Sequence, residues 1–194
     1  MNLPSEDDVW QALGRGVADR RHGFRTPVVS TIGLDGLPRA RTVVLRGCAR
    51  PERALWFHTD LRSPKIEEIR AQPGVSITLY DRKARLQVRA RGVAQIRHDD
   101  ARAQQSWQAT TDSARRCYAV QPGPGVALEA PASGMTPELE AQRISPEVAA
   151  EARSRFAVVW CVLQEMDVLA LHHAGHRRMK LTWTDEWLHT WCVP

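Results

Sequence analysis

Apolar positions recur along this chain mostly in short, closely spaced runs that are separated by turns containing glycine, proline or aspartate. β-branched and aromatic residues are frequent in these runs, which predicts strands more often than helices. The expected strands span residues 26–33, 41–46, 54–59, 75–80, 86–96, 156–163, 168–172, 178–182 and 187–193. Asp35-Gly36 separates the first two runs, and this dipeptide indicates a tight hairpin.

Helical spacing of apolar residues occurs in fewer places. Residues 5–20 show it, with Ser5 where an N-cap belongs. Ser63-Pro64 opens a second helix, because serine is a favoured N-cap and proline fits the first helical position. Two further helical segments are expected at 99–118 and 146–155. Many short strands with a few helices predict a mainly β fold with α elements, an antiparallel barrel with helices packed outside.

At 194 residues the chain is long enough for one domain with a real core. Within this single domain we expect an N-terminal helix through residue 22, a barrel core at 24–98, a helical and loop segment at 99–155, and C-terminal barrel strands at 156–194. The acidic N-terminus does not resemble a signal peptide, and no apolar run is long enough to span a bilayer. Four widely spaced cysteines predict a reducing, cytoplasmic setting without disulfides.

The net charge of +5 comes almost wholly from arginine. Arginine binds phosphate and carboxylate with a planar, two-pronged donor set, so an arginine excess suits anionic ligands. The alternative is a general compositional bias, because the arginines are scattered along the chain.

One region places positive charge and hydroxyl groups where a phosphate could bind. Thr59 ends a predicted strand, and Ser63 and Lys65 begin the next helix, where backbone N–H groups and the helix dipole favour an anion. Arg41 and Arg46 bracket the neighbouring strand. Side chains five apart on a strand point to opposite faces, so both can line one pocket only if a bulge or twist intervenes. The alternative is that these are solvated charges at the barrel edge.

Residues 39–96 resemble the pyridoxamine 5′-phosphate oxidase family of FMN-binding split β-barrels. The resemblance rests on the segments Arg41-Thr-Val-Val-Leu-Arg46, Phe57-His-Thr-Asp-Leu-Arg-Ser-Pro-Lys65, Gln87-Val88 and Gly92-Val-Ala-Gln-Ile96. It continues more weakly through Glu165–Leu169, His176–Leu181 and Trp191–Pro194. It implies an FMN-dependent oxidoreductase that is a homodimer with FMN bound at the subunit interface and that acts on a small-molecule substrate.

Carried over position by position, the resemblance implies a set of flavin contacts. Thr59 would lie beside the flavin with His58, Ser63 and Lys65 would contact the phosphate, and Gln87 would lie near the ring. Arg178 matches a late arginine that reaches the flavin of the partner subunit. The complete implied cofactor set is Arg41, Thr42, Val43, Val44, Arg46, His58, Thr59, Ser63, Lys65, Gln87 and Arg178.

This chain departs from the family pattern at several positions. Pro64 replaces a phosphate-binding arginine, with Arg62 as a possible substitute, and Leu169 replaces a tryptophan near the flavin. Gln105 and Ala109 replace the tyrosine and arginine that bind pyridoxal phosphate. These departures favour FMN and argue against oxidation of pyridoxamine 5′-phosphate itself, so the substrate stays open.

Alternatives from other classes remain at this point. The same fold could hold a deazaflavin or haem, or act as a flavin-binding module without turnover. The histidines at 172, 173 and 176 lack a nearby ligand set, so surface or flavin-edge positions are favoured over metal. Trp183, Trp187 and Trp191 could stack on nucleic-acid bases. Trp187 and Trp191 share one strand face, which favours barrel core or dimer interface over nucleic acid.

Overall fold

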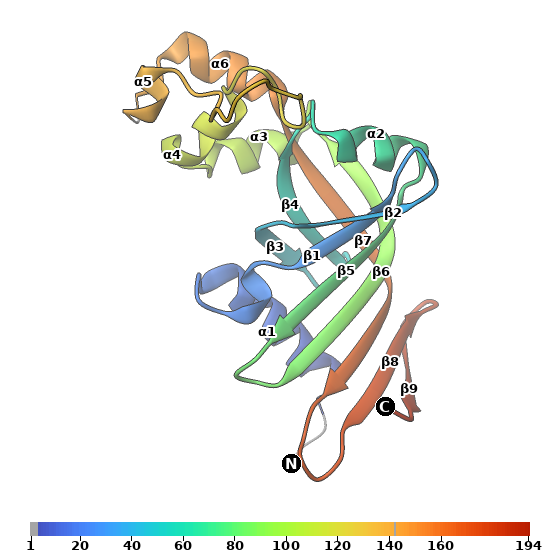
Figure 1. Ribbon diagram of the computed structural model, residues 1–194. Helices are drawn as coiled ribbons and strands as arrows, with labels where there is room; N and C mark the ends of the chain where they lie inside the picture. The colour runs from blue at the N-terminus through green and yellow to red at the C-terminus, as the bar shows by residue number, and fades with distance from the viewer. Residues whose placement is uncertain (1–3, 142) are drawn as a thin grey trace. The chain divides into compact units, whose positions relative to one another are not determined.

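The computed structural model describes residues 4–141 and 143–194. Its centre is a nine-stranded, mainly antiparallel sheet (Figure 1). The strands are β1 (Val28–Ile32), β2 (Pro38–Thr42), β3 (Leu45–Ala49), β4 (Ala54–Asp60), β5 (Gly74–Asp81), β6 (Leu86–Arg97), β7 (Phe156–Ala170), β8 (Arg177–Trp183) and β9 (Trp187–Cys192).

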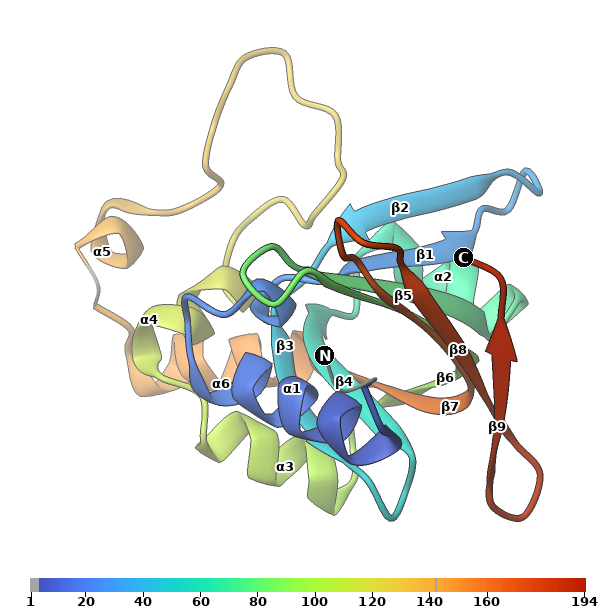
Figure 2. The ribbon, with the colours of Figure 1, turned by 90° about the horizontal axis from the view of Figure 1, so that it is seen from below.

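The strand order is β2-β1-β5-β6-β7-β4-β3, with β8 paired to β7 and β9 paired to β8. In the part of the chain that the structure describes, β2 and β3 end this path, so the sheet is split rather than closed. Figure 2 shows the β1–β2 and β8–β9 hairpins as two extended arms of the sheet. The predicted class, a mainly β split-barrel fold with peripheral helices, is confirmed.

Helices precede the first strand and lie between some of the later strands. They are α1 (Glu6–Ala18), α2 (Pro64–Ala71), α3 (Ala101–Gln108), α4 (Asp112–Arg115), α5 (Pro137–Glu140) and α6 (Pro146–Arg155), with single 3-10 turns at η1 (Gly23–Arg25) and η2 (Arg116–Tyr118). Ser5 caps α1 through a capping box with Asp8, which confirms the predicted start. No helix among the described residues is both long and apolar enough to cross a membrane.

The chain divides into two compact units. The sheet unit comprises Met1–Phe57, Glu68–Gln95 and Trp160–Pro194, and the helix unit comprises His58–Glu67 and Ile96–Val159. Met1, Asn2 and Leu3 lie outside the described residues, so the first positions of the expected N-terminal helix are not described. All four cysteines are free thiols.

Alternation along the strands separates a core face from a polar face in the sheet unit. On β5 and β6, Val75, Ile77, Val88 and Ala90 are buried on one face. The opposite face of β6 carries Gln87, Arg89 and Arg91, which are half-buried or exposed. This polar face is where charged side chains from β6, β7 and β8 meet.

Three expected elements differ from the structure. The expected strand at 41–46 is two strands, because Val43 donates its N–H to the Pro27 carbonyl (3.0 Å) and the chain leaves β2 there. The expected pair of strands at 156–172 is the single strand β7, since its polar middle residues face charged partners on the neighbouring strand. The expected helix at 99–118 breaks after Gln108, and Thr111 stands at the N-cap of α4.

Candidate functional site

An ammonium group and two buried hydroxyls converge in the helix unit where β4 turns into α2. Lys65 Nζ donates to Thr59 Oγ1 (3.0 Å) and to Ser63 Oγ (2.5 Å). Thr59 and Ser63 are each only 6% exposed. Pro64, which has no N–H, is the first residue of α2, so the N-terminal end of this helix lies at these groups. Thr59, Ser63 and Lys65, which we call the phosphate cluster, are therefore brought together as predicted.

The donor set of the phosphate cluster suits a phosphate dianion. It offers one positive charge, two hydroxyls that can each donate a proton, and the N-terminal end of an eight-residue helix. Charge-assisted hydrogen bonds of this kind are the strong ones, and a helix N-terminus adds a favourable dipole. The residues present thus fit the phosphate end of FMN.

Arg62, the possible substitute for the arginine that is missing at Pro64, is held by acceptors within the helix unit. Its guanidinium forms a bidentate pair with Asp60 (3.0 and 2.7 Å) and also donates to the Val120 carbonyl (3.1 Å) and to Gln121 Oε1 (3.2 Å). The hydrogen bonds that Arg62 donates to Asp60 raise the pKa of Arg62 above its usual value. Arg62 therefore fastens the segment around Gln121 to the β4–α2 turn.

The glycines that follow Gln121 let this segment pack closely on the same turn. A Cβ on Gly123 would lie 3.1 Å from Arg62 Nε. A Cβ on Gly125, whose φ is +88°, would lie 3.1 Å from Pro64 Cγ. The run Pro122–Gly125 and Pro64 are thus neighbours in space, which the sequence order alone does not indicate.

Arg41 lies at the end of β2 in the sheet unit, and its contacts are with a buried carboxylate. Its Nη2 is 2.7 Å from Glu68 Oε2 and its Nη1 is 2.5 Å from Thr31 Oγ1. Thr31 also donates to Glu68. Glu68 is 7% exposed, so the pair is largely shielded from solvent. Arg41 is held by β1 and α2 in this arrangement.

Arg46 lies on β3, at a shift in register between Leu45 and Gly47, whereas Arg41 lies on β2. The expectation that Arg41 and Arg46 share one strand is therefore wrong. Thr42, Val43 and Val44 form the end of β2 and the link to β3, and Val44 is 37% exposed. Because the strand breaks here, the regular alternation of side chains along one continuous strand does not determine which way these side chains point.

Gln87 and Arg178 both lie in the sheet unit. Gln87 pairs in register with Tyr80 of β5, and Arg178 pairs with Leu169 of β7 and Cys192 of β9. In the helix unit, the His58 ring packs edge-on against Phe156, with ring centroids 4.8 Å apart.

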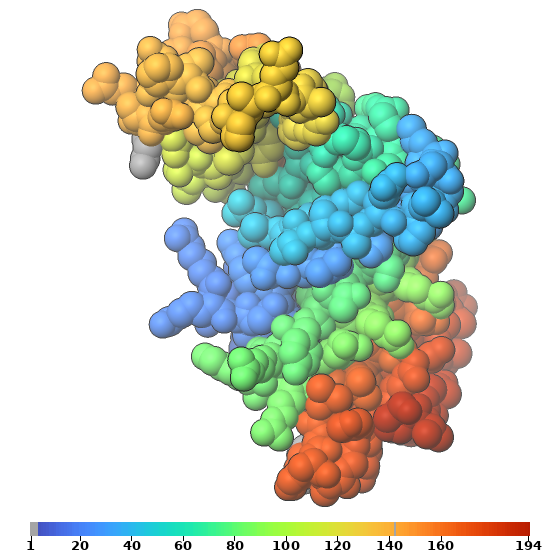
Figure 3. All heavy atoms as spheres, viewed as in Figure 1, coloured from blue at the N-terminus to red at the C-terminus, as the bar shows by residue number. Residues whose placement is uncertain are grey.

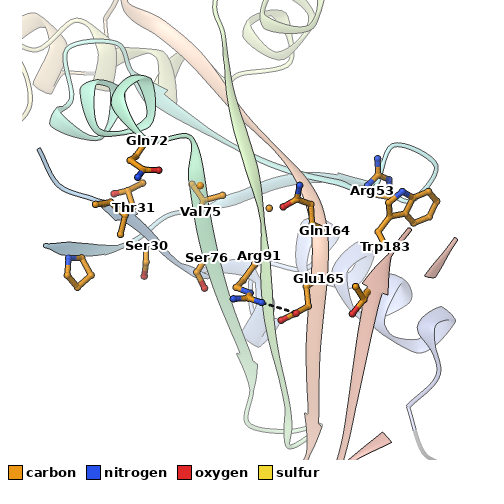
Figure 4. Close-up of a pocket in the computed structure, with 15 residues that line it drawn as sticks. Ser30, Thr31, Arg53, Gln72, Val75, Ser76, Arg91, Gln164, Glu165 and Trp183 are labelled. Carbon is orange, nitrogen blue, oxygen red and sulfur yellow. Dashed lines mark hydrogen bonds and ion pairs between the residues drawn. The ribbon is translucent and has the colours of Figure 1, made fainter. Parts of the chain in front are cut away.

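Two cavities open in the sheet unit. The larger, of about 990 Å³, is shown in Figure 4, where Arg53 lies over the ring of Trp183 (4.2 Å to the centroid) and Arg91 pairs with Glu165 (2.8 Å). None of the predicted cofactor residues is among the described residues that line it. A smaller cavity of about 220 Å³ is lined by charged groups that include Arg178 and Lys180.

The sequence does not predict the buried carboxylates that pair with arginines. They are Asp60, Glu68 and Asp167, which bind Arg62, Arg41 and Arg178 respectively. Glu68 is 27 residues from Arg41, so no local pattern reveals that pair. Within the described ranges, no group of three or more His, Cys, Asp or Glu side chains could hold a metal.

Comparison with known proteins agrees with this fold. A family model described as the FMN-binding domain of pyridoxamine 5′-phosphate oxidase matches residues 7–98. Pyridoxine/pyridoxamine 5′-phosphate oxidase 2 of Arabidopsis thaliana is 34% identical over 137 residues, which cover 61% of this chain and 68% of the plant protein. The enzyme of Flavobacterium johnsoniae is 40% identical over 67 residues, only 30% of its length.

Solved structures agree over the whole chain. A pyridoxamine 5′-phosphate oxidase-related, FMN-binding protein from Nostoc punctiforme has a TM-score of 0.78 and 27% identity, with both chains fully covered. PhzG from Burkholderia lata, with a TM-score of 0.74 and 19% identity over all of this chain and 98% of its own, supports the fold alone.

Fold and donor set thus define an FMN-binding split-barrel protein. The chain belongs to the pyridoxamine 5′-phosphate oxidase family, as the sequence resemblance implied, and FMN is its cofactor.

Proposed function

We propose that this protein is an FMN-dependent oxidoreductase, active as a homodimer, that acts on a small molecule other than pyridoxamine 5′-phosphate. The observation that carries the proposal is the phosphate cluster, where Lys65 Nζ meets two buried hydroxyls at the start of α2. When bound, FMN supplies hydride-transfer chemistry, and the protein supplies binding, orientation and selection of the substrate.

In this proposal the phosphate cluster holds the phosphate, with Arg41 as a further cation. The backbone and side chains from Thr42 to Val44, with Arg46, form the cradle for the flavin. His58, Thr59 and Gln87 lie beside the ring, and Arg178 reaches the flavin of the other subunit. These roles follow the family pattern residue by residue, and none of these groups is assigned as a general acid or base.

The dimer is proposed from the same pattern and from the surface of the C-terminal hairpin. Leu188 and Trp191 on β9 are 48% and 55% exposed, which is a large apolar area for two residues of one short strand. Such residues are typical of protein–protein contacts. A cytoplasmic setting follows as a prediction from the widely spaced, free cysteines.

Purification and anaerobic titration test the oxidoreductase proposal. We expect the protein to copurify with a ligand that has the mass and absorbance bands of FMN. We also expect a reducing substrate to bleach those bands in the absence of oxygen. A deazaflavin or haem in place of FMN would contradict the cofactor. Bound FMN that no reductant in a broad screen of small molecules bleaches would favour the alternative of a flavin-binding module without turnover.

We expect little or no turnover of pyridoxamine 5′-phosphate. Gln105 on α3 and Ala109 at its C-cap, which replace the family's tyrosine and arginine, lie about one turn apart and are both exposed. Neither side chain carries a charge that could hold the substrate's phosphate. An oxidase assay on the FMN-loaded protein measures this directly. A rate near the enzyme median of about 10 per second would show that other residues bind this substrate.

A further inference from the structure

A buried carboxylate on the polar face of the sheet unit is shared by two arginines. Asp167 lies on β7, and its side chain is 6% exposed. Arg178 on β8 donates from Nε to Oδ1 (3.0 Å) and from Nη2 to Oδ2 (2.7 Å). Arg89 on β6 donates from Nη2 to the same Oδ2 (2.5 Å). The three side chains, which we call the Asp167 clamp, link three neighbouring strands.

This geometry fixes the orientation of the Arg178 guanidinium. A bidentate pair holds the planar group at two of its three nitrogens, so it cannot turn without losing both hydrogen bonds. Among the described residues, Nη1 of Arg178 has no hydrogen-bond partner, and the side chain remains 27% exposed. The clamp thus presents one defined edge of Arg178 outward from the sheet.

The same contacts stabilise the negatively charged form of Asp167. Burial by itself would raise the pKa of this carboxyl, but hydrogen bonds from Arg178 and Arg89 outweigh burial and leave the pKa below its usual value. Asp167 is therefore ionised at neutral pH. Truncating it would leave two arginines, on the strands β6 and β8 that flank β7, without their shared counter-charge.

The clamp also ties Arg178 to the strand of Gln87. Arg89 follows Gln87 by two residues on β6, so both side chains lie on the same face. Leu169 follows Asp167 by two residues on β7 and is the register partner of Arg178. The clamp thus joins the strands that carry Gln87 and Arg178, two of the sheet-unit residues that the family pattern places at a flavin.

We propose that Asp167 is a positioning residue for flavin binding, which holds Arg178 in the orientation that FMN requires and does not itself touch the cofactor. This inference rests on the proposed function, because it takes Arg178 as a contact to the flavin of the partner subunit. It adds that the contact depends on a carboxylate that the cofactor does not reach.

A double-mutant cycle on FMN affinity separates positioning from a general effect on the fold. Asp167→Asn keeps the shape of the side chain but removes its negative charge. One carboxylate oxygen is replaced by an NH₂ group, which donates and cannot accept, so the side chain can no longer bind both arginines. We expect it to weaken FMN binding about tenfold, as measured by quenching of flavin fluorescence in the dimeric protein, and Arg178→Ala to weaken it by at least as much. Added to Arg178→Ala, the Asp167→Asn change should cause no further loss beyond about twofold.

Controls on the same face make the test specific. Glu165→Gln removes the neighbouring Arg91–Glu165 ion pair, which joins β6 and β7 and is more exposed than the clamp. This variant should bind FMN with an affinity within about twofold of wild type. Asp167→Glu keeps the charge and should bind FMN more tightly than Asp167→Asn. If Asp167→Asn does not fold, Asp167→Ser, which also removes the charge, takes its place in the cycle with Arg178→Ala.

Two results would overturn the inference while leaving the proposed function intact. One is an FMN affinity of Asp167→Asn that equals the affinity of the wild-type protein. The other is an equal loss from Asp167→Asn in the wild-type and Arg178→Ala backgrounds, which would make Asp167 a structural residue only. Failure of the wild-type protein to bind FMN at all would overturn the proposed function and this inference with it.

Discussion

Removing residues 185–194 should abolish dimerisation and FMN binding together. This deletion takes away β9, which pairs only with β8 among the described strands. It exposes the edge of β8, the strand that carries Arg178, and it removes Trp187, which packs edge-on against Trp183 with centroids 5.5 Å apart. An obligate dimer interface of this kind should bury on the order of 2,000 Å² in total. Light scattering and flavin titration on the same sample measure both losses.

A point variant guards against simple unfolding of the shortened chain. Figure 3 shows the β8–β9 hairpin at the surface of the sheet unit, and Trp191 is 55% exposed there. Trp191→Ala keeps β9 in place, and because buried interface tryptophans are common hot spots we expect it to weaken the dimer by about 2 kcal/mol or more. A shortened monomer that still binds FMN tightly would mean that one chain builds the whole site, and the role of Arg178 would have to be dropped.

The parts of the fold that the sequence predicts best are those whose signals are local. Ser5 and Asp8 form the capping box at the start of α1. Gly36, at φ +79°, lies in the predicted hairpin between β1 and β2. In each case the residues that decide the structure lie within a few positions of one another, so a short window of sequence contains the whole interaction.

The errors arise where distant residues decide the outcome. The break between β2 and β3 depends on the hydrogen bond from Val43 to Pro27, which no pattern within 41–46 contains. The polar residues at 164–167 suggest a loop, yet β7 continues through them because Glu165 and Asp167 find arginines on β6. Tertiary partners thus override a local preference in both places.

The same division applies to the site. Thr59, Ser63 and Lys65 lie within seven residues, and the structure brings them together as the sequence predicts. The question left open at Arg62 needed the structure, because its second set of partners lies near Gln121, 59 residues away. No local pattern indicates the role of Asp167 either, since its partner Arg89 is 78 residues distant.

Lys65→Ala should weaken FMN binding by roughly 1.5–3 kcal/mol, the usual loss for a hydrogen bond to a charged group. Lys65 Nζ is the cation of the phosphate cluster, and it contacts the Thr59 and Ser63 hydroxyls, which are proposed to bind the phosphate with it. Riboflavin lacks the phosphate, so the substitution should change its affinity far less. Lys83→Ala is the matched control, because Lys83 is an exposed lysine in the turn between β5 and β6.

The comparison of FMN with riboflavin in wild type, Lys65→Ala and Lys83→Ala tests the central claim most directly, because it asks where the phosphate lies. Isothermal titration of each protein with each ligand gives six affinities. We predict a large loss for FMN alone in Lys65→Ala and no change for either ligand in Lys83→Ala. Equal losses of FMN and riboflavin in Lys65→Ala would contradict the claim that the turn between β4 and α2 binds the phosphate of FMN.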